Sequence, residues 1–556
     1  MKYLKQIGSI CMFLFSVIIA NAQIEEFKTP NVILPEAAAL MKYIDYPVTL
    51  NTRLVDITIP LYMVKIGELT LPITLSYHTG GIKVNELDGP IALGWTLSAE
   101  PSVSRNVNGL NDEYPSLGYY SFRKENLGSN PDPYNSYFFY DKRVAGRYDT
   151  EPDDFYYKLA DKSGKFFIKK TNPLEYQSNP PFVPVPWEPI QIKQSNNFQV
   201  FSIKDENGIN YTFGDTSASS YGFYMADGIN KIKAHWKAKK MELGKDVINF
   251  NYEIKQFGQI GETQQGLTEC FTIEDRQGGE SFRTEYNGRK VGFFFPFVGE
   301  ISRNGEKFYE TTTSGNNVSK VTGISPIHSN IYSISVFRPT NYESRLYTID
   351  TQLEEIIFDT NAKGEYTTIK VFNKSTKTIT RTIKFYTESY KSYSWINRKK
   401  LTKVEILDEN NVVAEEYRFD YNGAPPEVNS KGLDHWGYYN GGNPQTGIPA
   451  QTLVVNISET TPRTGYMSVG HANRSADRES MKQGIIKSIT YPTGRKTEFE
   501  FEAHQYAIGK FAGGLRIAKI TEMDGSEKKI IKTFKYGENE LGYGTIKREV
   551  QATDYI

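Results

Sequence analysis

Hydrophobic and polar residues alternate with a period of two along most of this chain. In residues 201–204 and 209–213 the apolar side chains fall on one face, and a polar turn at 205–208 separates the two segments. This alternation predicts half-buried antiparallel strands. The Asn207-Gly208 pair in the turn favours a tight hairpin, because both residues tolerate positive φ.

The same layout returns at the turns 408–411, 492–495 and 524–525, each followed by a strand with alternating aromatic residues. Helical periodicity is nearly absent, and residues 35–43 are the best helix candidate. The 38 Tyr and 32 Phe suit pleated, half-buried surfaces. We therefore predict an all-β fold of stacked antiparallel hairpins that form a large curled sheet or sandwich.

Breaks in the pattern predict the domain organisation. Residues 1–22 have a basic start, an apolar run and a small-residue end, which predicts a signal peptide cleaved before Gln23 and export to the periplasm, cell surface or medium. An N-terminal β-region would follow at 23–172. Six prolines make 173–189 a linker or an extended edge segment. A central β-region at 190–425 would contain a polar insertion at 257–344, and 426–556 would form a C-terminal hairpin region.

Charge and cysteine content exclude several classes of protein. The 65 basic and 65 acidic residues cancel without long runs, so nothing indicates nucleic acid or an anionic membrane as partner. The first apolar run is too short for a membrane span, and no second one follows. Cys270 is the only cysteine after residue 22, so an intramolecular disulfide and a Cys-based zinc cluster are excluded. We predict no cofactor and no metal.

Several ordered motifs lie between residues 71 and 517. They are S-Y-H-x-G-G-I-K-V at 76–84, G-W-x-L at 94–97, S-R-x-V-x-G-L at 104–110, the block 148–167, D-H-W-G-Y-Y-N-G at 434–441 and G-G-L-R-I at 513–517. Their order resembles the N-terminal region of secreted bacterial RHS/YD-repeat proteins. The resemblance implies a YD-repeat-like β-region without the RHS core segment and C-terminal effector that usually follow it. It also implies a downstream YD-repeat or toxin polypeptide as a partner.

Two of these motifs could carry chemistry. Trp95, between Gly94 and Leu97, is either a buried core residue or an exposed platform for a glycan, and its flanking leucines favour the core. In the block 434–441, Trp436, Tyr438 and Tyr439 could form a sugar platform and His435 could act as a general base. The structural alternative is a tight aromatic corner, which Asp434 caps and Gly437 turns. Asp434 and His435 are neighbours, and neighbouring residues on a strand point to opposite faces. The two side chains would therefore not easily pair, which favours the tight corner.

Two pairs of neighbouring acidic residues are further candidates. Asp112-Glu113 and Asp153-Asp154 could bind Ca²⁺ or act in glycoside hydrolysis, but solvated turns explain such pairs more simply. We therefore expect a secreted, non-enzymatic structural or interaction module with an unidentified protein or glycan partner. The alternative is an extracellular glycan-binding protein or glycoside hydrolase.

Overall fold

The computed structural model separates residues 1–45 from residues 46–556, and it describes the second part between Tyr46 and Gly537. The predicted signal peptide and the candidate helix at 35–43 lie outside the described residues. Gaps fall at 50–52, 109, 116–117, 122–148, 150, 172–176, 178–179, 196–197, 215–233, 258–267, 274–284, 287–288, 291–292, 296–328, 335–340, 392–397, 429, 445–450, 457–463, 470–471 and 525–528. Only the backbone is described for strand residues at 254–257, 268–295, 329–334, 341–344, 451–456 and 464–469.

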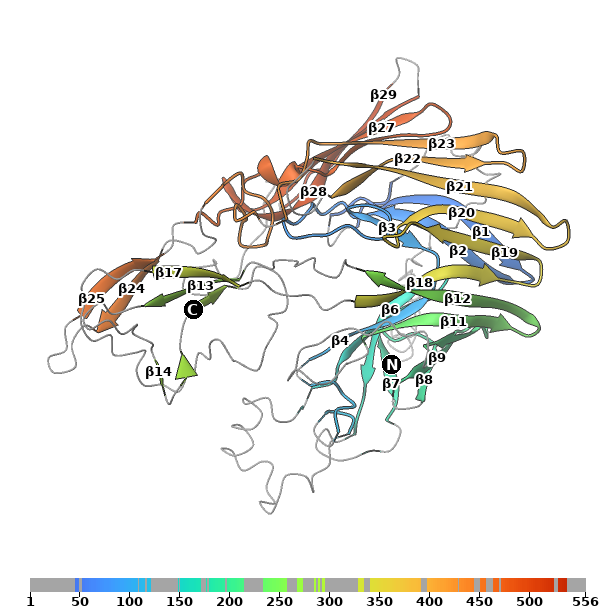
Figure 1. Ribbon diagram of the computed structural model, residues 1–556, viewed down its shortest axis with the longest axis horizontal. Helices are drawn as coiled ribbons and strands as arrows, with labels where there is room; N and C mark the ends of the chain where they lie inside the picture. The colour runs from blue at the N-terminus through green and yellow to red at the C-terminus, as the bar shows by residue number, and fades with distance from the viewer. Residues whose placement is uncertain are drawn as a thin grey trace, which may run out of the picture. The chain divides into compact units, whose positions relative to one another are not determined.

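A long antiparallel sheet carries most of the described chain (Figure 1). Its strands, in spatial order, are β8 (Gln191–Ser195), β9 (Val200–Lys204), β10 (Asn210–Phe213), β11 (His235–Leu243), β12 (Asp246–Phe257), β18 (Asn341–Asp350), β19 (Glu354–Thr360), β20 (Tyr366–Asn373), β21 (Thr378–Ser389), β22 (Lys399–Leu407), β23 (Val413–Tyr421), β26 (Ile486–Thr490), β27 (Lys496–Ala507), β28 (Lys510–Met523) and β29 (Lys529–Thr533). The prediction of an all-β fold built from antiparallel hairpins is confirmed.

Two smaller sheets complete the part of the fold that positions the candidate sites. The first contains β1 (Ile57–Ile66), β2 (Leu69–Tyr77) and β3 (Trp95–Ser98). The second contains β4 (Ser102–Asn106), β5 (Asp154–Lys158), β6 (Ser163–Ile168) and β7 (Phe182–Val185), and β4 also pairs with the start of β11. Among the described residues no ladder joins β7 to β8, so these sheets are not closed.

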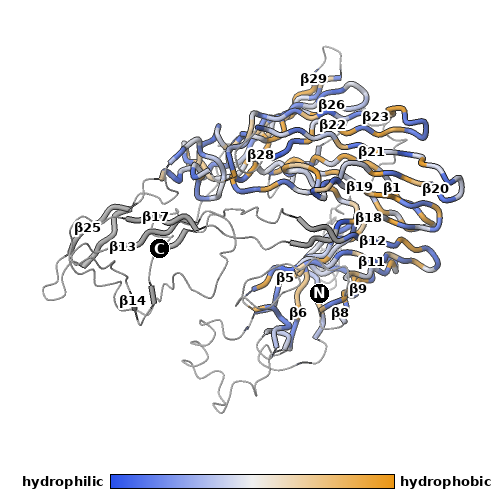
Figure 2. Tube along the Cα trace, in the orientation of Figure 1, coloured by the Kyte–Doolittle hydropathy of each residue, from blue (hydrophilic) through white to orange (hydrophobic). Residues whose placement is uncertain are grey.

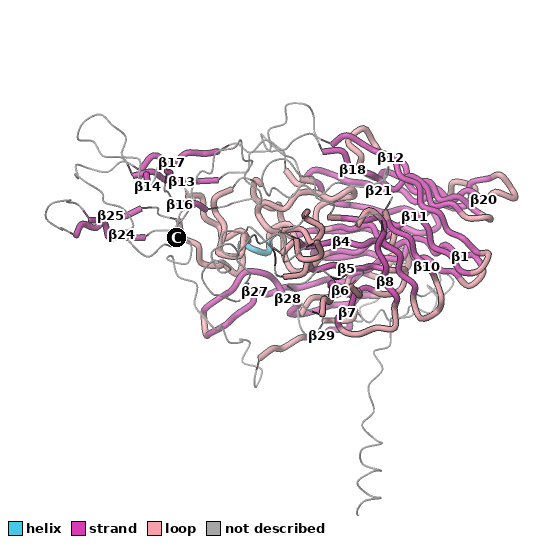
Figure 3. The backbone as a smooth tube through the Cα atoms, turned by 90° about the horizontal axis from the view of Figure 1, so that it is seen from below, coloured by secondary structure: helices cyan, strands magenta, loops and turns pink. Residues whose placement is uncertain are grey.

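The remaining elements are short. They are β13 (Thr268–Ile273), β16 (Phe293–Phe295) and β17 (Ser329–Ile334), the pair β14 (Glu285–Tyr286) and β15 (Arg289–Lys290), the pair β24 (Gln451–Asn456) and β25 (Thr464–Val469), and the 3-10 turn η3 (Ser480–Lys482). Strands and loops dominate the described part of the chain (Figure 3). Within that part, no helix has the length and apolar character needed to cross a membrane.

The predicted alternation creates the core. Figure 2 shows hydrophobic and hydrophilic residues alternating along the strands. In β2, every second residue from Leu69 to Tyr77 is buried. The sheet of β1 to β3 packs on the long sheet, because the ring of Trp95 lies 4.7 Å from that of Phe419 on β23. A second contact joins the same two sheets, since the Tyr62 hydroxyl on β1 donates to Glu354 on β19 at 2.6 Å.

The predicted hairpin at 201–213 forms, but its turn differs from the expectation. Asp205 N donates to Ile209 O, and Gly208 N donates to Asp205 O. Gly208 has a φ of 83°, whereas Asn207 is not among the described residues with positive φ. The predicted hairpin therefore forms with positive φ at Gly208 and not at Asn207. Since Asp205 Oδ1 accepts hydrogen bonds from the N–H groups of Asn207 and Ile209, the aspartate holds Asn207 in an ordinary turn conformation.

Two predicted breaks can be followed in the structure. Within 173–189, Phe182–Val185 forms β7 and pairs with β6, which agrees with an extended edge segment. The polar segment 257–344 is inserted between neighbouring strands, since its first residue Phe257 on β12 is the ladder partner of Asn341 on β18. Its last four residues, 341–344, belong to β18. The predicted domain boundaries remain predictions, and β23 pairs with β26 across the boundary at 425.

Candidate functional site

The Gly-Trp turn is part of the core. Trp95 is 2% exposed, and its Nε1 donates to the Tyr421 hydroxyl at 2.7 Å. Its ring centroid lies 5.0 Å from that of Tyr77. A Cβ atom on Gly94 would lie 2.7 Å from the Tyr77 ring, so glycine is needed for this close approach, and its φ of +76° needs glycine as well. Leu97 follows on the same strand and is half-buried. A buried indole cannot stack on a glycan, so the geometry supports the structural role.

In the block 434–441, the carboxylate of Asp434 caps a turn. The side chain is fully buried, and Oδ1 accepts hydrogen bonds from the N–H groups of Trp436 at 2.8 Å and Tyr438 at 2.9 Å. Burial raises the pKa of Asp434 to about 6, and these two N–H groups limit the rise. Gly437 turns the chain with a φ of +90°. This arrangement is the one that the structural interpretation predicts.

The three aromatic residues of this block are half-buried. Tyr438 packs against two glycines: a Cβ on Gly81 would lie 3.0 Å from its ring, and a Cβ on Gly513 would lie 2.8 Å from it. The same Cβ on Gly513 would lie 2.4 Å from Cβ of Trp436. Tyr439 forms a backbone bridge with Leu433. These contacts use the aromatic rings and their backbone for packing within the protein.

Backbone hydrogen bonds join three motifs that are far apart in the sequence. Val84 N donates to Gly437 O at 2.9 Å, and Leu515 N donates to Gly80 O at 2.9 Å. We call this meeting of residues 80–84, 434–439 and 513–515 the motif junction. Arg398, which no local sequence pattern marks, lies buried beside it: Nη1 donates to Val84 O at 3.1 Å and Nη2 donates to Pro426 O.

A second candidate site is a group of three buried aspartates: Asp112, Asp149 and Asp153. Each offers a carboxylate oxygen, and these oxygens all lie within 4.8 Å of one another. We call this group the aspartate cluster. Asp153 N donates to Asp112 Oδ1 and Asp112 N donates to Asp153 Oδ2, both at 3.1 Å. This exchange fixes two carboxylates whose residues are 41 positions apart in the chain.

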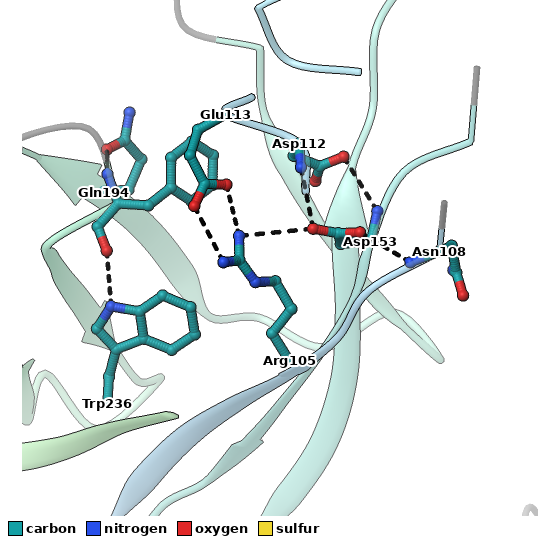
Figure 4. A network of polar contacts seen from close by, with 8 residues as sticks. Arg105, Asn108, Asp112, Glu113, Asp153, Gln194 and Trp236 are labelled. Carbon is teal, nitrogen blue, oxygen red and sulfur yellow. Dashed lines mark hydrogen bonds and ion pairs between the residues drawn. The ribbon is translucent and has the colours of Figure 1, made fainter. Parts of the chain in front are cut away.

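Arg105 on β4 lies beside the aspartate cluster (Figure 4). Its guanidinium binds Glu113 through both terminal nitrogens, at 2.5 and 3.0 Å, and Nη1 lies 3.5 Å from Asp153 Oδ2. Asn108 N donates to Asp153 Oδ1 at 3.0 Å. The ring of Trp236 on β11 lies 5.3 Å from the guanidinium carbon. Arg105 is therefore held in place from both sides, with its charge shared between two carboxylates.

Burial dominates the electrostatics of the aspartate cluster. It raises the pKa of Asp112 well above the usual range, and the neighbouring Asp153 carboxylate raises that pKa further. Burial also raises the pKa of Asp149 to about 7. For Asp153 burial raises the pKa to about 7, although the guanidinium of Arg105 opposes the rise. Carboxylates of this kind can hold a proton near neutral pH or can serve as ligands for a cation.

The expectation that Asp112-Glu113 and Asp153-Asp154 form solvated turns was wrong for both leading residues, since Asp112 and Asp153 have no exposed surface. The prediction paired each aspartate with its neighbour in the sequence, whereas the structure brings Asp112 against Asp153. Asp149 was missed, because no local pattern distinguishes it from a loop residue. Asp154 is half-buried on β5 and forms an ion pair with Lys165 at 2.9 Å.

These features define an all-β protein of antiparallel hairpins, in which three motifs meet at a packed junction. No family model and no curated protein matches the sequence. Among solved structures, the chain is similar to the N-terminal domain of effector protein SpvB from Salmonella typhimurium strain LT2. The sequence identity is 13% and the TM-score is 0.23, over 66% of this chain and 94% of that one. The fold class therefore rests on the strand pairings.

Proposed function

We propose that this protein is a secreted, non-enzymatic structural or interaction module of the RHS/YD-repeat kind. The motif junction carries the proposal. Trp436 and Tyr438, which could have formed a sugar platform, pack on Gly513. The Asp434 carboxylate, which could have oriented a general base, accepts two backbone N–H groups. These residues therefore serve the architecture of the β-region.

The aspartate cluster gives little support to glycoside hydrolysis. Its oxygens, within 4.8 Å of one another, approach the carboxyl separation of about 5 to 5.5 Å in retaining enzymes. A glycan must nevertheless reach both carboxyl groups, and Asp112 and Asp153 have no exposed surface. Burial, and not separation, is the reason that this cluster supports the non-enzymatic proposal more than glycoside hydrolysis.

The terminal strand β29 supports a polypeptide partner over a glycan. In the described part of the chain β29 pairs with β28 alone. Its residues Ile530 and Ile531 are 43% and 57% exposed, and an edge strand with exposed apolar side chains is open to pairing with another chain. A polypeptide that adds a strand here would pair with the outer backbone edge of β29 and would place its own side chains beside Ile530 on one face and Ile531 on the other. A downstream YD-repeat polypeptide, the partner that the resemblance implies, would continue the hairpin series.

Two substitutions in the block 434–441 test whether it is architecture or an active site. We expect Gly437→Val to impair folding, because a β-branched residue is strained at a φ of +90°. We expect His435→Ala to fold like the wild type. Thermal unfolding gives the stability of both variants, and release of reducing ends from a panel of polysaccharides measures hydrolysis.

The proposal predicts no turnover by any of the three proteins. Wild-type hydrolysis that disappears in a stably folded His435→Ala variant would show that the block is catalytic. Normal stability of Gly437→Val would show that the junction does not depend on this turn.

A further inference from the structure

The aspartate cluster contains oxygen atoms with no partner. Asp112 Oδ2 and Asp149 Oδ2 are buried and accept no hydrogen bond in the described structure. An unsatisfied buried acceptor is costly, and the cost is greater for a charged one. The other oxygens of these two residues accept the N–H groups of Asp153 and Glu151, each at 3.1 Å. Asp112 is thus held by Oδ1, while its Oδ2 accepts no hydrogen bond. Burial raises the pKa of Asp149, and the nearby N–H groups of Glu151 and Tyr119 oppose the rise.

Single buried aspartates elsewhere provide a comparison. Asp205 and Asp434 also have one unpartnered oxygen each, and each caps its turn with the other oxygen. Neither belongs to a group of acidic residues that could hold an ion among the described residues. The aspartate cluster differs because Asp112, Asp149 and Asp153 direct their oxygens to one place.

We propose that the aspartate cluster binds one Ca²⁺ ion, with Asp112, Asp149 and Asp153 as the protein ligands. Ca²⁺ prefers carboxylate oxygens at about 2.3 to 2.6 Å, so two ligands on opposite sides of the ion are separated by about 4.6 to 5.2 Å. The oxygens of the cluster lie within 4.8 Å of one another and fit around such an ion with little movement. Mg²⁺ requires near-ideal octahedral geometry with bonds of about 2.0 to 2.1 Å, which three carboxylates fixed by backbone hydrogen bonds meet less readily than the flexible coordination of Ca²⁺.

The surrounding charges agree with a divalent cation. The three aspartates and Glu113 bring four carboxylates together, and Arg105 binds Glu113 with two hydrogen bonds. Lys170 is a second buried cation, and its Nζ donates to Tyr119 O at 3.0 Å. A bound Ca²⁺ would balance the remaining negative charge and would satisfy the free oxygens of Asp112 and Asp149.

The ion would add a further link between parts of the chain that hydrogen bonds of Asp112 and Asp153 already join. Asp112 and Asp149 lie in loops on either side of the segment 122–148, and Asp153 precedes β5. The ion would therefore link residues that precede and follow this segment in the sequence. A ligand that binds the folded state alone stabilises it in proportion to the logarithm of its concentration.

Calcium binding is tested with the full-length protein after removal of metal with a chelator and dialysis. Isothermal titration with CaCl₂ at neutral pH should show one bound ion per chain. The thermal midpoint should rise with Ca²⁺ concentration and should rise less with Mg²⁺. The absence of both heat and a shift in the midpoint would overturn the proposal, and equal responses to the two ions would overturn the assignment to calcium.

Two variants locate the site. Asp149→Asn should lower Ca²⁺ affinity at least about tenfold, since even outer-shell partners of a metal typically contribute that much. Asp154→Asn is the matched control, because Asp154 is adjacent to the cluster but pairs with Lys165. It should bind Ca²⁺ like the wild type.

Unchanged affinity in Asp149→Asn would place the ion elsewhere and would refute the site. If Asp149→Asn does not fold, Asp112→Asn replaces it. The wild-type titration decides in either case whether an ion is bound. Hydrolysis assays on the block 434–441 test the proposed function separately, so failure of one proposal does not imply failure of the other.

Discussion

The motif junction and the aspartate cluster both bring distant segments together, but they do so by different physical means. At the junction, Tyr438 packs on Gly81 and Gly513, and backbone hydrogen bonds complete the contact. In the aspartate cluster, like charges are buried against one another, and one guanidinium offsets part of the repulsion. Close packing is stable without help, whereas converging carboxylates need a proton or a cation. The difference separates an architectural site from one built for a ligand.

The largest effect is expected in the core beneath the junction. Trp95→Ala should lower the free energy of unfolding by about 3 to 5 kcal/mol, the usual cost of emptying such a site. The loss should be the same with and without Ca²⁺, because Trp95 contacts Tyr77, Phe419 and Tyr421 and no carboxylate. Denaturant titration measures it. Trp187→Ala is the control, since Trp187 is 75% exposed and its loss should cost less than about 0.5 kcal/mol.

A smaller effect is expected from the titration of Asp434. Its pKa is about 6 in the folded protein and 3.8 in the reference state, so the folded chain binds the proton more tightly. The stabilisation from this proton is complete below about pH 4 and is lost as pH rises through 6. Because one pKa unit corresponds to about 1.4 kcal/mol, the wild type should lose up to about 3 kcal/mol relative to Asp434→Asn over this range.

Denaturant titrations of both proteins between these pH values give the difference directly. Since other carboxyl groups titrate in both proteins, only the difference reports on Asp434. Parallel curves for the two proteins would mean that the pKa of Asp434 is the same in the folded and the unfolded chain. The turn-capping aspartate would then resemble an exposed one, and the contrast with the cluster would weaken.

The smallest effect is expected from Asp149→Asn, and it tests the difference between the motif junction and the aspartate cluster most directly. In chelator at neutral pH, Asp149→Asn should change the free energy of unfolding by about 1 kcal/mol or less, because the loss of a like charge offsets the loss of a hydrogen bond. In saturating Ca²⁺ the same variant should be clearly less stable than the wild type. Thermal unfolding under both conditions measures the change. An equal loss of stability in chelator and in saturating Ca²⁺ would show that Asp149 has an ordinary structural role.

Local features of the fold could be predicted from the sequence. The alternation in residues 201–213 defines which side chains are buried, because the side-chain period of a strand is two. Asp205 and Gly208 indicate the position of the turn, but not that Gly208 alone takes positive φ. For Trp95, the flanking leucines indicate that the side chain is buried. They do not indicate that its ring contacts the rings of Tyr77 and Phe419.

The candidate sites could be predicted only in part. The block 434–441 was recognised as a tight corner, since its glycines and Asp434 act within a few residues of one another. The aspartate cluster could not be recognised, because Asp112 and Asp153 meet through the pairing of β4 with β5, and sequence neighbours gave the wrong comparison. Arg398 was missed for the same reason: its acceptors Val84 and Pro426 belong to other segments.

The hydrogen bond between Leu515 N and Gly80 O has a consequence for the order of folding. A growing chain presents Gly80 early, but its partner appears only after more than four hundred further residues have been synthesised. Contacts of such long range form late, since closing the loop must precede any gain from the contact. Until then the sheet of β1 to β3 has an exposed apolar face that chaperones or proteases can engage. Formation of the junction therefore covers this apolar face and ends the access of chaperones and proteases to it.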